Sequence, residues 1–137
     1  MIRESAIRIP FRYAAGVAGS RFLAALRDER RILGGRCAAC ALVYAPLRSF
    51  CAACGAAPLA EVEIGPGGVL QSWTERADGT VFALVRLDGA DAALLHRLLA
   101  APGEARCGMR VRARFAAERR ASILDIAGFE PAAGGTP

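Results

Sequence analysis

The chain has 137 residues, 54% of them hydrophobic, and a formal net charge of +5. A chain of this length can bury one modest core with a small appended module. No apolar run approaches the roughly 18 residues that cross a bilayer, so we expect no membrane-spanning helix. The N-terminus has early arginines but lacks the apolar stretch of a signal peptide, so we expect a cytoplasmic protein with reduced cysteines.

All eighteen basic residues are arginine, and they are distributed unevenly. Residues 1–36 hold eight arginines against three acidic residues, whereas the rest of the chain is neutral. An excess of positive charge at one end suits an acidic partner surface or a phosphate-bearing ligand. A solvated basic arm explains the same charge equally well.

The first predicted unit, residues 1–35, consists of an arm and a helix. From Ile7 to Arg12 apolar residues alternate with arginine and proline, which is typical of an edge strand or of an arm lying on a partner. Gly16 to Gly19 indicates a turn, and Ser20 is a plausible N-cap for a helix that ends near Arg31, ahead of Gly34-Gly35. The apolar face of this helix is narrow, so the following unit or another subunit has to cover it.

The second predicted unit, residues 36–57, holds two Cys-x-x-Cys pairs separated by ten residues. The four cysteines are Cys37, Cys40, Cys51 and Cys54. Two tight turns joined by a short hairpin bring four thiolates to the corners of a tetrahedron, which is the geometry of structural Zn²⁺. Leu42 to Tyr44 is the predicted hairpin strand, Pro46 ends it, and Gly55 permits the positive φ at which such a turn closes.

Two other interpretations of the four cysteines compete with zinc. Structural disulfides are disfavoured, because no signal peptide precedes them and closely spaced pairs make strained bridges. Iron in a rubredoxin-type redox centre uses the same four ligands, and the sequence does not strictly separate it from zinc. Zinc is the favoured metal.

The third predicted unit, residues 58–130, has the pattern of short strands broken by turns. The predicted strands are residues 61–74, 81–87, 92–98, 109–115 and 122–126. The first is bent at the glycine cluster Gly65 to Gly68, as at a barrel corner. Five strands with one sharp bend fit an OB-type barrel, and residues 131–137 are predicted to be a disordered tail. The predicted fold class is therefore mainly β, with an N-terminal helix, a zinc ribbon and a five-stranded OB-fold barrel.

The other residues that could take part in catalysis are better explained by structural roles. His96 is the only histidine and Cys107 the only cysteine outside the two pairs, and nothing near them supplies an obvious oxyanion hole. Asp88, Asp91 and Asp125 lie at turns or strand ends, where carboxylates commonly cap backbone amides. We expect no catalytic residue in this chain.

Beyond the cysteines, a series of short motifs runs from about Ser20 to Phe129. In order these are Arg-Cys-x-x-Cys, Val-Tyr-x-Pro, Ser-Phe-Cys-x-x-Cys-Gly, Trp-Thr, Leu-Asp-Gly-Ala-Asp, Leu-Leu-His-Arg-Leu, Gly-Met-Arg-Val and Asp-Ile-x-x-Phe-Glu. The series resembles the DUF35 family, in which a rubredoxin-like zinc ribbon is joined to an acyl-CoA-associated OB-fold. The chain departs from that family at Ala41, which stands where the first Cys-x-x-Cys turn usually has glycine. It also departs in the hairpin, where many members have Pro-Pro-Arg and this chain has Ala45-Pro46-Leu47-Arg48.

The resemblance implies a non-catalytic accessory subunit of a thiolase-like complex, either an acyl-CoA acyltransferase or a retro-aldolase. In that case the partner carries the catalytic cysteine and histidines, and this chain stabilises it, in a heterotetramer of two plus two subunits. The resemblance also suggests a bridge to a hydratase and contact with a coenzyme A thioester. Breakdown of aromatic compounds through benzoylsuccinyl-CoA, of steroids and of fatty acids are all compatible pathways, and the sequence does not indicate the acyl group.

Contacts with this partner or with coenzyme A are expected on the apolar face of the helix and at arginines of the helix and of the fourth barrel strand. The expected contact residues are Phe22, Leu23, Leu26, Arg27, Arg30, Arg110, Arg112 and Arg114.

Proteins of two other functional classes contain a similar ribbon or barrel. A ribbon joined to an OB barrel also describes single-stranded nucleic-acid binders, but these interleave aromatic residues with basic ones, and the face of Arg110, Arg112 and Arg114 has none. A rubredoxin-like electron carrier would be strongly acidic, which the basic N-terminal segment contradicts. Both functions are disfavoured.

Overall fold

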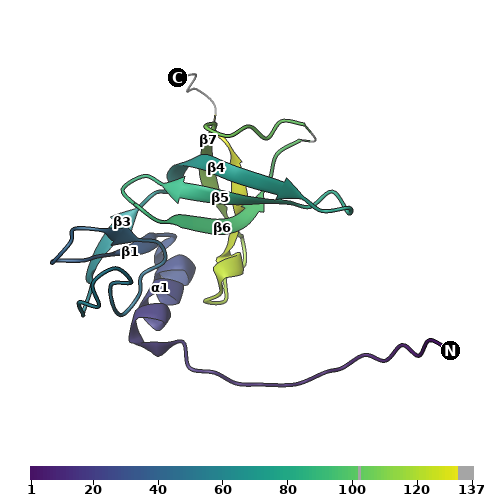
Figure 1. The fold of residues 1–137 in the computed structure, drawn as a ribbon, viewed down its shortest axis with the longest axis horizontal. Coiled ribbons are helices and arrows are strands. Elements are labelled where there is room, and N and C mark those ends of the chain that lie inside the picture. The colour runs from purple at the N-terminus through teal and green to yellow at the C-terminus, as the bar shows by residue number, and fades with distance from the viewer. Residues whose placement is uncertain (102, 133–137) are drawn as a thin grey trace.

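The computed structural model describes residues 1–101 and 103–132. Its elements are helix α1 (Gly16–Glu29), strands β1 (Ile32–Arg36), β2 (Val43–Tyr44), β3 (Ala60–Ile64), β4 (Gly67–Glu75), β5 (Val81–Leu87), β6 (Ala93–Leu98) and β7 (Arg110–Phe115), the 3₁₀ helix η1 (Ile123–Asp125) and strand β8 (Ile126–Pro131). The ribbon and α1 lie beside a barrel, and the N-terminal segment extends away from both (Figure 1). Within the described residues, no helix has the length and hydropathy needed to cross a membrane.

Five strands close into a barrel in the order β4-β5-β6-β8-β7. All neighbours are antiparallel except β6 and β8, which meet in parallel at Leu98 and Phe129. Counted within the barrel, this order is 1-2-3-5-4, the strand order of an OB-fold. The predicted fold class, mainly β with an N-terminal helix, a four-cysteine ribbon and a five-stranded barrel, is therefore confirmed.

A second, three-stranded sheet has the order β2-β1-β3. Strand β3 pairs with β1 along its whole length, from Ile32 opposite Ile64 to Arg36 opposite Ala60. The predicted first barrel strand, residues 61–74, is thus wrong as a single strand. The segment forms two strands that are separated at Gly65, where the backbone has a positive φ of 66°. Of these two strands, only β4 belongs to the barrel. The ribbon sheet extends beyond residues 36–57 on both sides.

Helix α1 covers the ribbon sheet. It begins earlier than predicted, so Gly16 to Gly19 is its first turn rather than a preceding loop, and Ser20 is not its N-cap. Phe22 is 4% exposed and Leu26 fully buried, in one cluster with residues of β1 and of the barrel. The expectation that a partner contacts Phe22 and Leu26 is therefore corrected, because the chain's own core covers them. Leu23 is half-buried against the same core.

The glycine pair predicted to end the helix has a different role. The helix ends at Glu29, and its C-cap Arg30 adopts the left-handed conformation (φ 54°). Gly34 and Gly35 are buried residues of β1. A Cβ on Gly34 would lie 2.7 Å from the carbonyl oxygen of Tyr44, so a side chain there would separate β1 from β2.

The end of the chain differs from the prediction by a few residues. Residues 122–126 were expected to form the last strand, but Ser122 and Asp125 form a capping box that begins η1. The strand follows as β8, which continues to Pro131, the first residue of the predicted tail. Residues 133–137 of that tail lie outside the described residues.

The buried side chain of His96 ties β6 to η1. Its Nε2–H donates to the carbonyl oxygen of Ile123 (3.1 Å), and Nδ1 accepts from the Arg97 backbone N–H (2.8 Å). Its ring also meets Phe129 edge-on, at 6.0 Å between centroids. Burial lowers the pKa of His96, because desolvation disfavours the imidazolium form. His96 is therefore a neutral structural residue.

This pKa predicts a pH dependence of stability. A lowered native pKa means that the unfolded chain, with a histidine pKa of about 6.5, takes up a proton before the native protein does. The free energy of unfolding should therefore fall as the pH drops from about 6.5 towards the native pKa of His96. His96→Gln retains a donor for Ile123 and removes this titration. Urea unfolding at several pH values should give a smaller decrease for the variant than for the wild type, and equal decreases would contradict the assignment.

Candidate metal centre and its surroundings

The two Cys-x-x-Cys segments form turns with the same backbone hydrogen bonds. In the first, the Ala41 N–H donates to the Cys37 carbonyl oxygen and the Cys37 N–H donates to that of Leu42, both at 2.9 Å. The second turn, which begins at Cys51, repeats both bonds at the corresponding residues and at the same length. Gly55 closes it with a φ of 73°, as the sequence predicted.

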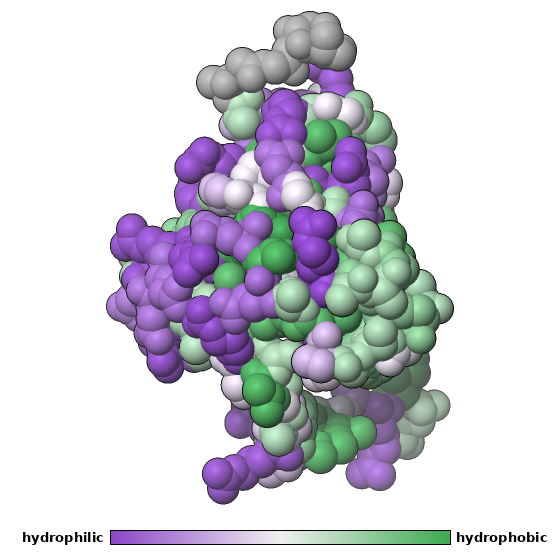
Figure 2. Space-filling model, turned by 90° about the vertical axis from the view of Figure 1, so that its left-hand side faces the viewer, coloured by the Kyte–Doolittle hydropathy of each residue, from purple (hydrophilic) through white to green (hydrophobic). Residues whose placement is uncertain are grey.

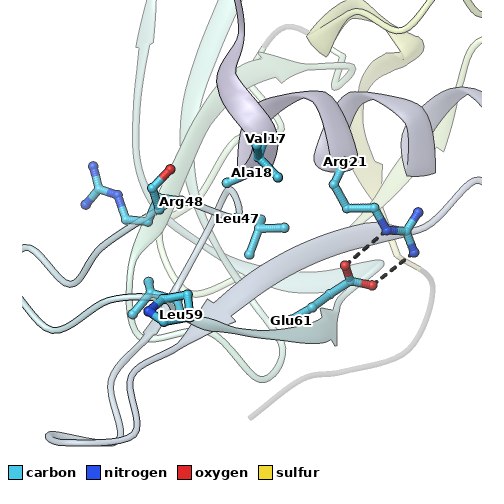
Figure 3. A pocket seen from close by; sticks show the side chains of 9 residues that line it. Val17, Ala18, Arg21, Leu47, Arg48, Leu59 and Glu61 are labelled. Atoms are coloured by element: carbon cyan, nitrogen blue, oxygen red, sulfur yellow. Dashed lines mark hydrogen bonds and ion pairs between the residues drawn. The ribbon is translucent and has the colours of Figure 1, made fainter.

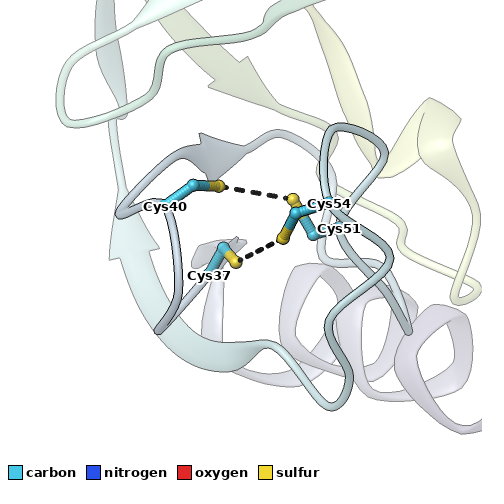
Figure 4. Close-up of side chains that lie close together, drawn as sticks. All are labelled: Cys37, Cys40, Cys51 and Cys54. Carbon is cyan, nitrogen blue, oxygen red and sulfur yellow. Dashed lines mark hydrogen bonds between the residues drawn. The ribbon is translucent and has the colours of Figure 1, made fainter.

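The four cysteine sulfurs converge at one point between these turns (Figure 4). Sγ of Cys37 lies 3.5 Å from that of Cys54, Sγ of Cys40 lies 3.5 Å from that of Cys51, and all four lie within 4.8 Å of one another. A tetrahedral Zn²⁺ with four sulfur ligands at about 2.3 Å has sulfurs about 3.8 Å apart. The donor set fits zinc. The separations also exceed the roughly 2.05 Å of a disulfide, and all four cysteines are free.

Hydrogen bonds stabilise the thiolate forms of two of the cysteines. The Tyr44 hydroxyl donates to Sγ of Cys51 (3.2 Å) and lowers the pKa of that thiol to about 6. The guanidinium of Arg48 lies over the Tyr44 ring, 5.1 Å from its centre, and helps to hold it in place. On the other turn, the backbone N–H of Cys40 is the main cause of a lowered pKa at Cys37.

The other two cysteines resist ionisation. The Leu42 backbone N–H lowers the pKa of Cys40, but the adjacent sulfurs of Cys37 and Cys51 outweigh it and the pKa rises to about 12. Four thiolates this close repel one another, so all four cysteines can ionise only if a positive charge lies between them. A divalent cation supplies that charge, and a Zn²⁺ held by four thiolates has no open position for a substrate. The centre therefore has the character of a structural site.

The metal centre is partly exposed. Cys37 and Cys51 are buried against Leu59, whereas Cys40 and Cys54 are exposed at the tips of the turns. On the face of the molecule that carries the ribbon, hydrophilic residues gather on the left of the middle region and hydrophobic residues on its right (Figure 2).

One aspartate joins the ribbon to the barrel. Oδ2 of Asp91, in the turn between β5 and β6, accepts from the Val43 N–H at 2.8 Å. In return the Val43 carbonyl oxygen accepts from the backbone N–H groups of Asp91 (2.9 Å) and Ala92 (3.3 Å). The prediction that Asp91 caps backbone amides is confirmed, and the amide that its side chain caps belongs to the hairpin between the cysteine pairs.

The other two aspartates have different partners. Asp125 is buried and accepts from the backbone N–H groups of Arg120 (2.9 Å) and Ser122 (3.2 Å), as predicted. Asp88 instead forms a two-pronged ion pair with Arg110, at 2.8 and 2.5 Å, which lowers the pKa of the Asp88 carboxyl.

The predicted arginine contacts differ in availability. Arg110 is engaged by Asp88, Arg27 pairs with its neighbour Asp28, and Arg114 lies 3.8 Å from Glu130. Arg30 and Arg112 are exposed and have no ion-pair partner within residues 1–101 and 103–132. These two are therefore the freest of the five predicted arginines.

A pocket between α1 and the ribbon was not foreseen from the sequence. It has a volume of about 280 Å³ (Figure 3). Val17 and Ala18 of α1, Leu47, and Leu59 with Pro58 contribute its apolar wall. At its rim, Arg21 donates two hydrogen bonds of 3.0 Å to Glu61 of β3. No sequence motif marks this pocket, because its walls come from three separate segments.

Ala41 is the residue at which the two turns differ, and it allows a direct test of their geometry. Its φ of 61° is unfavourable for a residue with a Cβ. Ala41→Gly should therefore raise the free energy of unfolding of the metal-loaded protein by about 1 kcal/mol. Gly55→Ala is the matched control, because a Cβ there would meet nothing within 4 Å and only the backbone is strained. It should lower stability by a similar amount in urea unfolding, and no change in either variant would contradict this geometry.

Comparison with known proteins supports the description of both units. A family model described as "ChsH2, rubredoxin-like zinc ribbon domain" matches residues 24–60. The chain is similar to one from a solved structure described as the Ltp2-ChsH2(DUF35) aldolase, with 25% identity over 88% of this chain and 98% of that chain, and a TM-score of 0.63. It is also similar to a DUF35-family protein of unknown function from Sulfolobus solfataricus, with 25% identity over 72% and 78% of the two chains and a TM-score of 0.59.

A search of curated proteins found no match. The matched ribbon contains all four cysteines of the metal centre, and the structural likeness extends over the barrel as well. The chain is therefore similar to DUF35-family proteins over both its ribbon and its barrel.

Proposed function

We propose that this chain is a non-catalytic accessory subunit that binds and stabilises a thiolase- or aldolase-type enzyme. The observation that carries the proposal is the similarity to a chain of the Ltp2-ChsH2(DUF35) aldolase, which extends over 98% of that chain's length. The likeness includes both the ribbon and the barrel, so it concerns the whole subunit and not the zinc motif alone.

The chemistry of the described residues supports a non-catalytic role. Acyl transfer of the thiolase type needs an activated nucleophile with a base beside it. Four of the five cysteines belong to the metal centre, which leaves no open coordination position when it is loaded. The only histidine, His96, is buried and has both ring nitrogens engaged. We assign the catalytic cysteine and histidines to the partner.

The assembly that we propose is a heterotetramer of two accessory and two thiolase-like subunits, to which a hydratase also binds. Arg30 and Arg112 are the proposed contacts with acidic groups of the partner or with the phosphates of coenzyme A, because both are exposed and unpaired among the described residues. The proposal extends to degradation of an acyl-CoA thioester in the cytoplasm, without a specific acyl group.

Binding of single-stranded nucleic acid is the second candidate. One observation favours it: Phe82 of β5 lies opposite Arg97 of β6, which places an aromatic residue beside a basic one on the barrel. Such proteins, however, stack successive bases on several aromatics. Phe129 is fully buried and Phe115 packs against the core, so neither is available for stacking.

The test is to isolate the protein under native conditions from its own cells and to identify by mass spectrometry what accompanies it. The accessory role predicts a thiolase-fold protein in stoichiometric amount, absent from a mock isolation from cells without the tagged chain. Recovery of the chain alone, or with nucleic acid detected by absorbance at 260 nm and removed by nuclease, would contradict it.

A further inference from the structure

The N-terminal segment belongs to no helix or strand of the described structure. Residues 1–13 have no hydrogen bond to the rest of the described chain, and Figure 1 shows them leading away from the folded body. Four alternate residues carry large apolar side chains that are 74–81% exposed. They are Ile7, Ile9, Phe11 and Tyr13. We call residues 1–15 the arm and these four side chains its apolar stripe.

The apolar stripe has the geometry of one face of a strand. Side chains two residues apart lie on the same face of an extended chain. The rings of Phe11 and Tyr13 are stacked accordingly, with centroids 6.0 Å apart and planes inclined by 28°. Arg8 and Arg12 lie between them in the sequence and belong to the opposite face. One face of the arm is therefore apolar and the other basic.

Proline decides which edge of the arm can pair. In a strand, the N–H and C=O of one residue point to one edge, and those of the next residue point to the other. Ile7, Ile9 and Phe11 present an uninterrupted set of donors and acceptors along one edge. Pro10 lacks an N–H, so the edge that it shares with Arg8 and Arg12 is incomplete. The arm can thus join a sheet as its outermost strand but not as an interior one.

Within residues 1–101 and 103–132, the chain itself offers no good site for this strand. The barrel is closed and has no free edge. In the ribbon sheet, β2 is only two residues long. The other outer strand, β3, carries Glu61 and Glu63, which already pair with Arg21 and Arg31 of α1 and the following turn. Pairing between copies is opposed by the net charge of +5 on each.

We propose that the arm adds as an edge strand to a β-sheet of the catalytic partner, with its apolar stripe against that subunit and its arginines towards acidic side chains beside the sheet. Exposed sheet edges bind extended segments in this way, with backbone hydrogen bonds giving affinity and alternate side chains giving specificity. The inference rests on the proposed function and names the part of this chain that holds the partner. It also explains why so much apolar surface is exposed on the arm, since docking would bury it.

Hydrogen exchange at single-residue resolution tests the pairing itself. The chain is compared alone and in complex with the thiolase-fold subunit recovered by native isolation. The amides of Ile7, Ile9 and Phe11 should exchange at least about tenfold more slowly in the complex, whereas those of Arg8 and Arg12 should stay fast. Equal protection at both sets of residues, or none, would overturn strand addition. Protection that appears in the isolated chain as its concentration rises would assign the arm to a second copy instead.

Two variants test the contribution of the arm to binding. Ile9→Asp places a charge in the apolar stripe and should weaken the complex at least about tenfold. Pro10→Ala is the matched control, because it restores an N–H only on the edge that faces away from the partner, so its affinity should equal that of the wild type. Neither residue contacts the folded body, so circular dichroism should be unchanged in both. Wild-type affinity of Ile9→Asp would overturn the inference.

The two proposals fail in different ways. If the purified wild-type chain does not bind the thiolase-fold subunit, the proposed function falls and the docking of the arm falls with it. If the wild-type complex forms but the arm amides exchange freely within it, only the docking is wrong.

Discussion

Four thiols held within 4.8 Å of one another are the constraint on which the rest of the structure depends. The two turns and Tyr44 favour ionisation of Cys37 and Cys51, while the pKa of Cys40 is raised by the thiols beside it. The cluster is therefore incomplete without a cation. A structural zinc ion contributes on the order of 10 kcal/mol to the folding of a small ribbon, which is comparable to the whole stability of a typical domain. For a segment this rich in alanine, no apolar core could replace it.

The metal centre reaches the rest of the molecule through the ribbon sheet. Strand β1 runs directly into Cys37 and lies between β2 and β3, and Ile32 and Leu33 at its start share one apolar cluster with α1 and the barrel. Asp91 adds a second connection by bonding to Val43 in the hairpin between the cysteine pairs. The ribbon sheet therefore packs against α1 and contributes residues to the main hydrophobic core. Among the described residues, the arm is the only long segment without hydrogen bonds to the rest of the chain.

The sequence was most informative where chemistry depends on spacing. The cysteine pairs and the number of barrel strands followed from local pattern, as did the capping role of Asp125. Prediction from the sequence failed where contacts between distant segments determine the structure. Gly34 has the pattern of a helix terminator but is required by the close approach of β2, and residues 61–64 have the pattern of a barrel strand but pair with β1. Phe22 was assigned to a partner because the sequence does not show that the ribbon sheet and the barrel together cover α1.

The most direct test of this account is hydrogen exchange in β1 before and after removal of the metal with a chelator under reducing conditions. If the centre supports the ribbon sheet and, through it, the helix, the amides of Leu33 and Gly35 should lose their protection together with those of the cysteine turns. Exchange in α1 should rise in parallel, because Leu26 packs on the same sheet. Metal removal that leaves β1 and α1 as protected as before, with only the tips of the two turns affected, would contradict the central role given to the four thiolates.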